Sequence, residues 1–201
     1  MKTAIIGCGA IANTHIDVIK HLGLNLVAIC DLSEDKASAL LGKHGVTATI
    51  YTDYEKMLDE AKPYVVHICT PHWEHAKMSI AALERNINVL CEKPVCISPE
   101  QYAAIKAAEK HSAAVMGVCF QNRYLETNEK LRALAVEEGA KGIFAAVPWS
   151  RDENYYLSTD WRGRKATEGG GVMMNQAIHT LDLALWMLGN PVAVKIGRAH
   201  V

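Results

Sequence analysis

The feature that most constrains the fold of this chain is a glycine turn, Gly7-Cys8-Gly9, placed directly between a short apolar run and a helical pattern. The run TAIIG predicts a buried strand, and a helix is expected from about Ala10 to Leu22. In such a unit the first glycine permits a tight turn, the second lets a pyrophosphate approach the backbone, and a small residue in the helix allows close packing. The pattern predicts a dinucleotide-binding turn rather than an ordinary glycine-rich one, and the residues expected around the phosphates are Gly7, Gly9, Ala10, Ile11 and Ala12.

Apolar runs and helical segments continue to alternate up to about residue 121. Strands are expected at LVAICD, YVVHICT, INVLCEKP and AVMGVCF, and helices at residues 33–41, 72–85 and 98–111. This alternation is typical of parallel strands joined by crossover helices. The sequence therefore predicts an α/β fold, with a doubly wound, Rossmann-type parallel sheet in residues 1–121 and a second domain in residues 122–201.

Asp31 ends the second expected strand, 19 residues after Ala12. A carboxylate at this position accepts hydrogen bonds from an adenosine ribose and repels a 2′-phosphate. The next two residues, Leu32 and Ser33, supply no cation for a 2′-phosphate, although Lys36 lies within reach of one. The sequence therefore favours NAD over NADP.

Two further motifs, TPHWEH and CEKP, follow later strands at the carboxyl edge, where ligands bind in open α/β sheets. Pro94 disfavours the helical region for Lys93 and holds it extended, so its ammonium is expected to project over the crevice. There it would stabilise negative charge developing on a substrate oxygen. The alternative is that Glu92, Lys93 and Pro94 only end a strand in a solvated turn.

The segment EGGGVMMNQAIHTLDLALWMLG, residues 168–189, opens with three glycines and continues as a helical pattern. One stripe of it is apolar and is expected to face a core: Met174, Ile178, Leu181, Leu185 and Leu188. A second stripe, about 100° round the helix, carries Asn175, His179 and Asp182. The glycines would let a ligand come close to this polar stripe, although a lone helical histidine is more often structural.

Composition excludes several classes of protein. The 201 residues carry a net charge of −1 without a basic patch, so neither nucleic acid nor an acidic membrane surface is expected as a partner. No signal sequence or membrane-spanning run is recognisable, and the six cysteines contain no CxxC pair. We expect a cytoplasmic protein with reduced thiols, and metal ligation only as a minor alternative.

Taken together, GCGAIA, TPHWEH, CEKP, FQNRY and EGGGVMMNQAIHTLD resemble the Gfo/Idh/MocA family of nicotinamide-dependent sugar oxidoreductases over nearly the whole chain. The resemblance implies an N-terminal Rossmann domain, a C-terminal α/β domain built on a large open antiparallel sheet, and an active site between them. It also implies NAD as cofactor, a small sugar-type substrate and a homo-oligomer.

The resemblance assigns roles to particular residues. It implies that Lys93 and His179 line the sugar site beside the nicotinamide, His179 taking the hydroxyl proton while Lys93 stabilises the alkoxide. Many members carry Asp where this chain has Asn175, so the amide is expected to orient a substrate hydroxyl instead of sharing a proton. Asp182 either orients His179 or is structural. The remaining expected contacts are Thr70, Pro71, His75, Glu92 and Gln121 with the cofactor, and Arg123, Trp161 and Arg162 with the substrate.

Two other activities stay open at this level. Some relatives use bound NAD to hydrolyse a glycosidic bond without net oxidation, and others are non-catalytic NAD-binding sensors or subunits. After residue 121 the pattern predicts a helix at 124–138 but only two strands, GIFAAVPWSR and PVAVKI, too few for the broad sheet. We therefore expect a truncated second domain. The last six residues, IGRAHV, read as the translation of a common sequencing adapter, and we expect Arg198 and His200 to have no function.

Overall fold

The computed structural model describes residues 1–195 and 197. These residues form two compact units. The Rossmann unit comprises residues 1–119 together with 153–171, and the helical unit comprises residues 120–152 and 172–201 as far as they are described. The segment 153–171 thus belongs with the first unit, which differs from the expected boundary at residue 121. The residues of IGRAHV other than Gly197, including Arg198 and His200, lie outside the described part of the chain.

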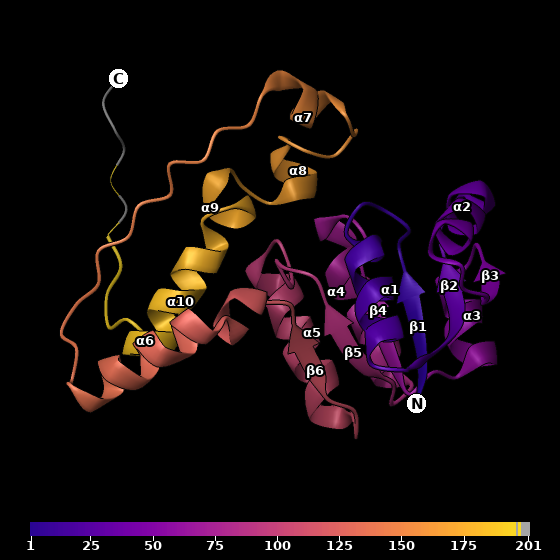
Figure 1. Ribbon diagram of the computed structural model, residues 1–201, viewed down its shortest axis with the longest axis horizontal. Coiled ribbons are helices and arrows are strands. Elements are labelled where there is room, and N and C mark those ends of the chain that lie inside the picture. The colour runs from indigo at the N-terminus through magenta and orange to yellow at the C-terminus, as the bar shows by residue number, and fades with distance from the viewer. Residues whose placement is uncertain (196, 198–201) are drawn as a thin grey trace. The chain divides into compact units, whose positions relative to one another are not determined.

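Six parallel strands form the sheet of the Rossmann unit in the order β3-β2-β1-β4-β5-β6, which confirms the doubly wound fold (Figure 1). The strands are β1 (Lys2–Ile6), β2 (Asn25–Cys30), β3 (Thr49–Tyr51), β4 (Val65–Ile68), β5 (Asn88–Cys91) and β6 (Met116–Val118). The order reverses between β1 and β4. The crevice beyond the carboxyl ends of these two strands is therefore the position where such sheets bind ligands.

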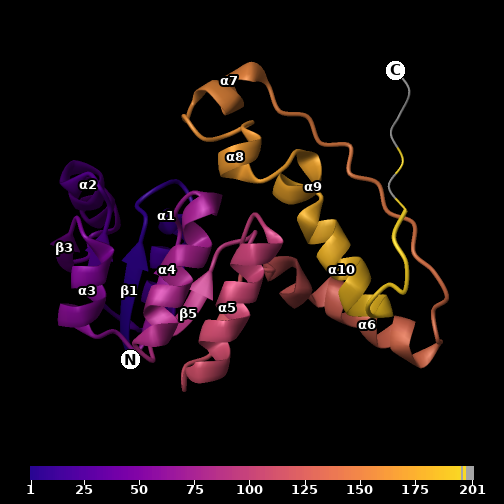
Figure 2. The ribbon, with the colours of Figure 1, turned by 180° about the vertical axis from the view of Figure 1, so that it is seen from behind.

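The helices cover both faces of this sheet (Figures 1 and 2). On one face, α1 (Ala12–His21) and α2 (Glu34–His44) pack on β1 and β2 through Ile5, Ile16 and Ile29. The other face carries α3 (Tyr54–Ala61), α4 (His72–Glu84) and α5 (Pro99–His111), with Leu58 and Leu83 in its core. The short elements β3 and α3 were not predicted, whereas the other strands and helices of residues 1–119 match expectation.

The N-termini of these five helices differ in how their free N–H groups are satisfied. Ser33, Asp53 and Ser98 accept hydrogen bonds from the first turns of α2, α3 and α5, respectively. No side chain caps α1 or α4, the two helices that follow β1 and β4. The uncapped N-termini thus belong to the helices that begin at the reversal point, where backbone donors remain for an anion.

In the helical unit the described residues form no strand, so the expectation of strands at 142–151 and 191–195 is wrong. The unit contains a 3-10 turn, η1 (Gln121–Tyr124), and the helices α6 (Glu126–Glu137), α9 (Val172–Asn175) and α10 (Ile178–Leu188). Two further short helices, α7 (Glu153–Leu157) and α8 (Lys165–Glu168), belong to the Rossmann unit. A lone strand has no partner to satisfy its backbone groups, which explains why isolated β-type sequences stay irregular here.

The prediction that one apolar side of the segment 168–189 faces a core is also wrong. The helix is interrupted at residues 176 and 177, so α9 and α10 do not share one continuous stripe. Leu181, Leu185 and Leu188 are each at least 40% exposed, whereas Asn175 and Asp182 are less than 10% exposed. Within the described residues, no sheet of the helical unit covers the leucines, and its polar groups are buried instead.

None of the helices in the described residues has the length and apolar character required to cross a bilayer.

Candidate active site

The glycine turn separates two steric roles. Gly7 has a φ of 94°, and a Cβ added to it would lie 2.7 Å from the carbonyl carbon and oxygen of Cys69. Glycine is therefore required at position 7, because the backbone that follows β4 lies too close to leave room for a side chain. A Cβ on Gly9 would meet no atom within 4 Å, so the fold leaves the space beside Gly9 open. This is the space that a pyrophosphate needs to approach the backbone.

Ile11 and Ala12 begin α1 directly beyond this turn. Ile11 is the N-cap residue, and the N–H of Ala12 reaches back to the carbonyl of Gly9 at 3.2 Å. Ala12 is completely buried against the sheet, as its small size predicts, while Ala10 and Ile11 are exposed. The residues expected around the phosphates thus share one turn at the open N-terminus of α1.

Asp31 lies at the end of β2 beside the glycine turn. Its Oδ2 accepts a hydrogen bond from the backbone N–H of Cys8 at 2.8 Å, and Oδ1 accepts one from the N–H of Ser33 at 3.0 Å. An ionised carboxylate has about four acceptor positions, so two remain for ribose hydroxyls. The two backbone bonds fix the orientation of the carboxylate before any ligand binds.

His75, which was expected to contact the cofactor, is completely buried in α4. Its Nδ1 lies 2.7 Å from the carbonyl oxygen of Pro94, and its Nε2 lies 2.8 Å from that of Thr70. Burial lowers the pKa of His75. In this structure the His75 side chain offers no exposed surface to a ligand. The imidazole instead ties the turn after β4 to the EKP loop, and Pro71 serves as the N-cap of α4.

The EKP loop contains an interaction that sequence reasoning missed. Glu92 Oε1 lies 3.0 Å from Nε2 of His15 in α1, and Nδ1 of His15 lies 2.9 Å from Nδ1 of His67 in β4. Burial and the neighbouring His15 lower the pKa of His67 to about 4. The available signal was His67 itself, because a histidine inside an apolar strand needs a buried partner. Glu92 thus faces α1 from the loop that carries Lys93.

Cys119 completes the surroundings of Glu92. Burial and the Glu92 charge raise the pKa of the Cys119 thiol to about 12. Ligand atoms of His15, Glu92 and Cys119 all lie within 4.8 Å of one another, a spacing that would permit a cation. His15 and Glu92 already satisfy each other through their hydrogen bond. All six cysteines are unpaired.

A second group joins the segment 153–171 to α4. The ring of Trp161 packs edge-on against His72, with 4.7 Å between centroids, and His72 Nδ1 lies 2.9 Å from the carbonyl oxygen of Glu168. The buried Glu168 carboxylate accepts the N–H of Gly163 at 2.7 Å. His72 and Glu168, which were not predicted as site residues, therefore hold the Trp161-Arg162-Gly163 loop.

Arg162 is the cation of this loop. Its guanidinium carbon lies 4.3 Å from the ring centroid of Tyr155 and 5.4 Å from that of Trp161, and Nη1 donates to Ser158 Oγ at 3.1 Å. The aromatic rings and the serine orient the arginine within the Rossmann unit. The predicted substrate contacts Trp161 and Arg162 thus lie together in one loop.

In the helical unit, His179 lies in the first turn of α10 and Asn175 ends α9. The His179 ring packs edge-on against Phe120, with 6.2 Å between centroids, and Asn175 Oδ1 accepts a hydrogen bond from Gln176 Nε2 at 3.2 Å. The interruption between α9 and α10 therefore separates these two candidate residues onto different helices. Gln121, the expected cofactor contact in this unit, is exposed on η1.

Arg123 and Asp182 form a two-pronged ion pair within the helical unit. Arg123 Nε donates to Asp182 Oδ2 at 2.8 Å, and Nη2 donates to Oδ1 at 2.5 Å. The hydrogen bond and charge of Asp182 raise the pKa of Arg123, even though burial opposes this. Each carboxylate oxygen accepts one hydrogen bond from the arginine, and the Asp182 side chain is only 8% exposed, which favours the structural role of Asp182. The ion pair uses two of the five N–H donors of Arg123, and the other three, on Nη1 and Nη2, remain for the expected substrate contact.

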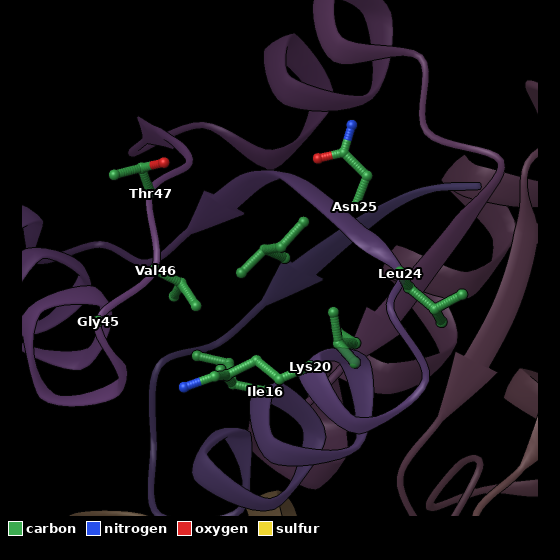
Figure 3. A pocket seen from close by; sticks show the side chains of 9 residues that line it. Ile16, Lys20, Leu24, Asn25, Gly45, Val46 and Thr47 are labelled. Carbon is green, nitrogen blue, oxygen red and sulfur yellow. The ribbon is translucent and has the colours of Figure 1, made fainter.

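A pocket of about 280 Å³ lies elsewhere, between α1, the start of β2 and the end of α2 (Figure 3). Its lining includes Ile16, Lys20, Asn25 and Val46. These residues adjoin the amino ends of β2 and β3, whereas the glycine turn, Asp31 and the EKP loop follow the carboxyl ends of their strands. The pocket therefore has no part in the dinucleotide crevice.

An open glycine turn, an uncapped helix and a fixed carboxylate after β2 define a dinucleotide-binding protein of the Rossmann class. The model of the oxidoreductase family with an NAD-binding Rossmann fold, GFO/IDH/MocA, matches residues 1–120, and the GFO/IDH/MocA C-terminal domain matches residues 131–200. The chain belongs to the GFO/IDH/MocA oxidoreductase family.

Known relatives are dehydrogenases of sugars and cyclitols. The chain is 32% identical to D-glucoside 3-dehydrogenase of Escherichia coli K12 over its whole length, which is 57% of that protein. It is 27% identical to inositol 2-dehydrogenase of Salmonella typhimurium, covering 94% of this chain and 54% of the relative. The chain thus spans little more than half the length of these relatives.

Two solved structures are similar in fold. The WlbA dehydrogenase from Bordetella pertussis in complex with NADH and UDP-GlcNAcA matches with a TM-score of 0.84 and 29% identity, covering 94% of this chain and 59% of that one. Levoglucosan dehydrogenase in complex with NADH and levoglucosan matches with a TM-score of 0.80 and 26% identity, over 94% and 54% of the two chains.

Proposed function

We propose that this chain binds NAD(H) in preference to NADP(H), and that the protein carrying it transfers a hydride between NAD and a hydroxyl-bearing carbon of a sugar, sugar nucleotide or cyclitol. The observation that carries the proposal is the open space at Gly9 beside an uncapped α1 and the fixed Asp31 carboxylate. The named relatives, which act on glucosides and inositol, support the substrate class.

The residues divide the work in the following way. NAD, when bound, supplies the hydride acceptor or donor. His179 takes the proton of the substrate hydroxyl as general base, and Lys93 stabilises negative charge that develops on a substrate oxygen. Asn175 orients a neighbouring hydroxyl, and Trp161 with Arg162 offers an aromatic and cationic surface to a sugar ring. The six unpaired cysteines support a cytoplasmic location.

The cofactor half of the proposal is tested by titrating the chain with NADH and, separately, with NADPH while nicotinamide fluorescence is followed. We expect NADH to bind at least about ten-fold more tightly, which corresponds to about 1.4 kcal/mol. Replacing Asp31→Asn removes the charge that repels a 2′-phosphate and should bring the two affinities together. Asp35→Asn, an exposed acidic residue in the first turn of α2, is the matched control.

Equal affinity for NADH and NADPH in the unaltered chain would contradict the assigned role of Asp31, and failure to bind either would contradict the site. Turnover separates the alternatives. Accumulation of NADH with a sugar substrate supports a dehydrogenase, whereas release of an aglycone without NADH would indicate a glycosidase. Cofactor binding without either reaction would indicate a sensor or subunit.

A further inference from the structure

His67, His15 and Glu92 form a buried polar chain to which the proposed hydride transfer assigns no role. The chain runs from β4 through α1 to the loop after β5, with separations of 2.9 Å between the two histidines and 3.0 Å between His15 and Glu92. Both histidines are no more than 7% exposed. Burying three polar side chains is unfavourable unless they satisfy one another, so their alignment constrains all three positions.

The position of one proton in this chain follows from elementary rules. Burial acts to raise the pKa of Glu92, but hydrogen bonding and charge from His15, together with Lys93, lower it overall. Glu92 is therefore ionised near neutral pH, and an ionised carboxylate only accepts hydrogen bonds. Nε2 of His15 must carry the proton of the shared bond. The proton between the two Nδ1 atoms of His15 and His67 can reside on either nitrogen, and in both cases the hydrogen bond from His15 Nε2 to Glu92 is kept.

Glu92 passes this constraint on to its neighbour. Glu92 directly precedes Lys93 in the chain, and both the backbone N–H of Lys93 and its ammonium charge act to lower the pKa of the Glu92 carboxylate. A carboxylate held by His15 on one side therefore holds the backbone of Lys93 on the other. Because α1 begins at the glycine turn, the same helix that presents donors to a pyrophosphate also presents His15 to this loop.

We propose that His15 is a positioning residue for Lys93: it fixes the Glu92 carboxylate, and that carboxylate fixes the Lys93 backbone at the edge of the crevice. His67 orients the ring of His15. The importance of this placement for catalysis rests on the proposed function, in which Lys93 acts on the substrate oxygen. The placement itself is a property of the Rossmann unit and is measurable without turnover.

The test uses two replacements of His15 that retain different halves of the imidazole. His15→Gln places an amide donor where Nε2 reaches Glu92, whereas His15→Asn places an amide only near His67. The lysines of the full 201-residue chain are labelled by reductive ¹³C-methylation, which preserves their charge, and are observed by NMR. The signal of Lys93 is assigned by its loss in Lys93→Arg.

We expect the Lys93 signal to shift in His15→Asn and to stay near its original position in His15→Gln. The signal of Lys106, an exposed lysine of α5 paired with Glu109, should be unchanged in both. His21→Asn, which alters an exposed histidine at the end of the same helix, should leave Lys93 in place. An unshifted Lys93 signal in a folded His15→Asn variant would overturn the proposal. Equal shifts in the Asn and Gln variants would also overturn it, because the contact with Glu92 would not then be the cause.

Titration of the same samples with NADH separates this proposal from the proposed function. If the unaltered chain does not bind NADH, the cofactor proposal fails, yet the comparison of Lys93 signals still tests the positioning role. If NADH binds and the Lys93 signals do not follow the expected pattern, only the positioning role fails.

Discussion

The glycine turn allows a steric prediction with opposite outcomes at two neighbouring positions. Gly7→Ala should destabilise the fold without removing any ligand contact. Gly9→Ala should weaken ligand binding without destabilising the fold. An added Cβ at Gly7 would lie 2.7 Å from two backbone atoms of Cys69 and 2.9 Å from the backbone nitrogen of Thr70, at a φ of 94°. None of these atoms can move independently, because they belong to the turn between β4 and α4.

The magnitude for Gly7→Ala follows from two terms. A left-handed backbone costs an L-residue about 1–2 kcal/mol, and forcing a methyl group into a packed region costs about 1–3 kcal/mol. A total of about 3 kcal/mol would lower the melting temperature of a chain of this length by about 6–12 °C. At Gly9 no atom lies within 4 Å, so Ala should leave the stability unchanged or raise it by about 0.4–1 kcal/mol.

Circular dichroism melting and NADH fluorescence titration of both variants provide the assay. We expect Gly9→Ala to melt with the unaltered chain but to bind NADH at least about ten-fold more weakly, since its methyl group occupies the approach of the pyrophosphate. Unchanged NADH affinity in Gly9→Ala would refute the assignment of that space. A Gly7→Ala variant that melts within about 2 °C of the unaltered chain, less than about 1 kcal/mol, would refute the steric argument.

Two further predictions concern the buried charges. Arg123→Ala should strand the Asp182 carboxylate, whose side chain is 8% exposed, at a cost below the about 3–5 kcal/mol of a fully buried pair because Arg123 is 35% exposed. Replacing both residues should lower the free energy of unfolding by less than the sum of the two single replacements. Additive losses in urea unfolding would show that the two side chains do not interact. Burial lowers the pKa values of His67 and His72 to about 4, below the ordinary 6.5. As pH falls from 6.5 towards 4, only the unfolded chain takes up these protons, so stability should fall by up to about 1.4 kcal/mol per pH unit for each histidine. His72→Asn retains an amide donor towards Glu168 and should flatten this slope in urea unfolding at pH 7 and 5; an unchanged slope would contradict a neutral His72.

Most of the sheet was predictable because each of its long strands is a short apolar run followed by a helical segment. The segment TATIY, which contains β3, was missed because it has only three strand residues, none of them fully buried. The reverse error occurred at GIFAAVPWSR, whose composition favours a strand although the structure forms none there. Strand propensity measures how well a side chain fits a pleated surface, so it cannot predict whether a neighbouring strand is present.

The segment 168–189 shows a related limit. The spacing of its apolar residues predicted one helix, and most of the segment is helical, in α9 and α10. The interruption at residues 176 and 177 was not predictable, because neither Gln176 nor Ala177 is a helix-breaking residue. The apolar period also predicted which side should be covered. In the structure Leu181 and Leu185 are exposed. The prediction failed because periodicity identifies a surface that would gain from burial, but not the element that would bury it.

The polar residues that sequence reasoning missed share one property: their partners come from distant elements. His15 and His67 are 52 residues apart, and His15 and Glu92 are 77 apart, yet each pair is within hydrogen-bonding distance. A single element can be judged from its own pattern, whereas a buried polar group is stable only if the complete fold supplies its partner. Once the strand order places β4 beside β1, His67 faces the helix that follows β1, and His15 is the residue there that can satisfy it. The strand order is therefore the information that the local sequence patterns lack, since it brings His67, His15 and Glu92 together beside Lys93.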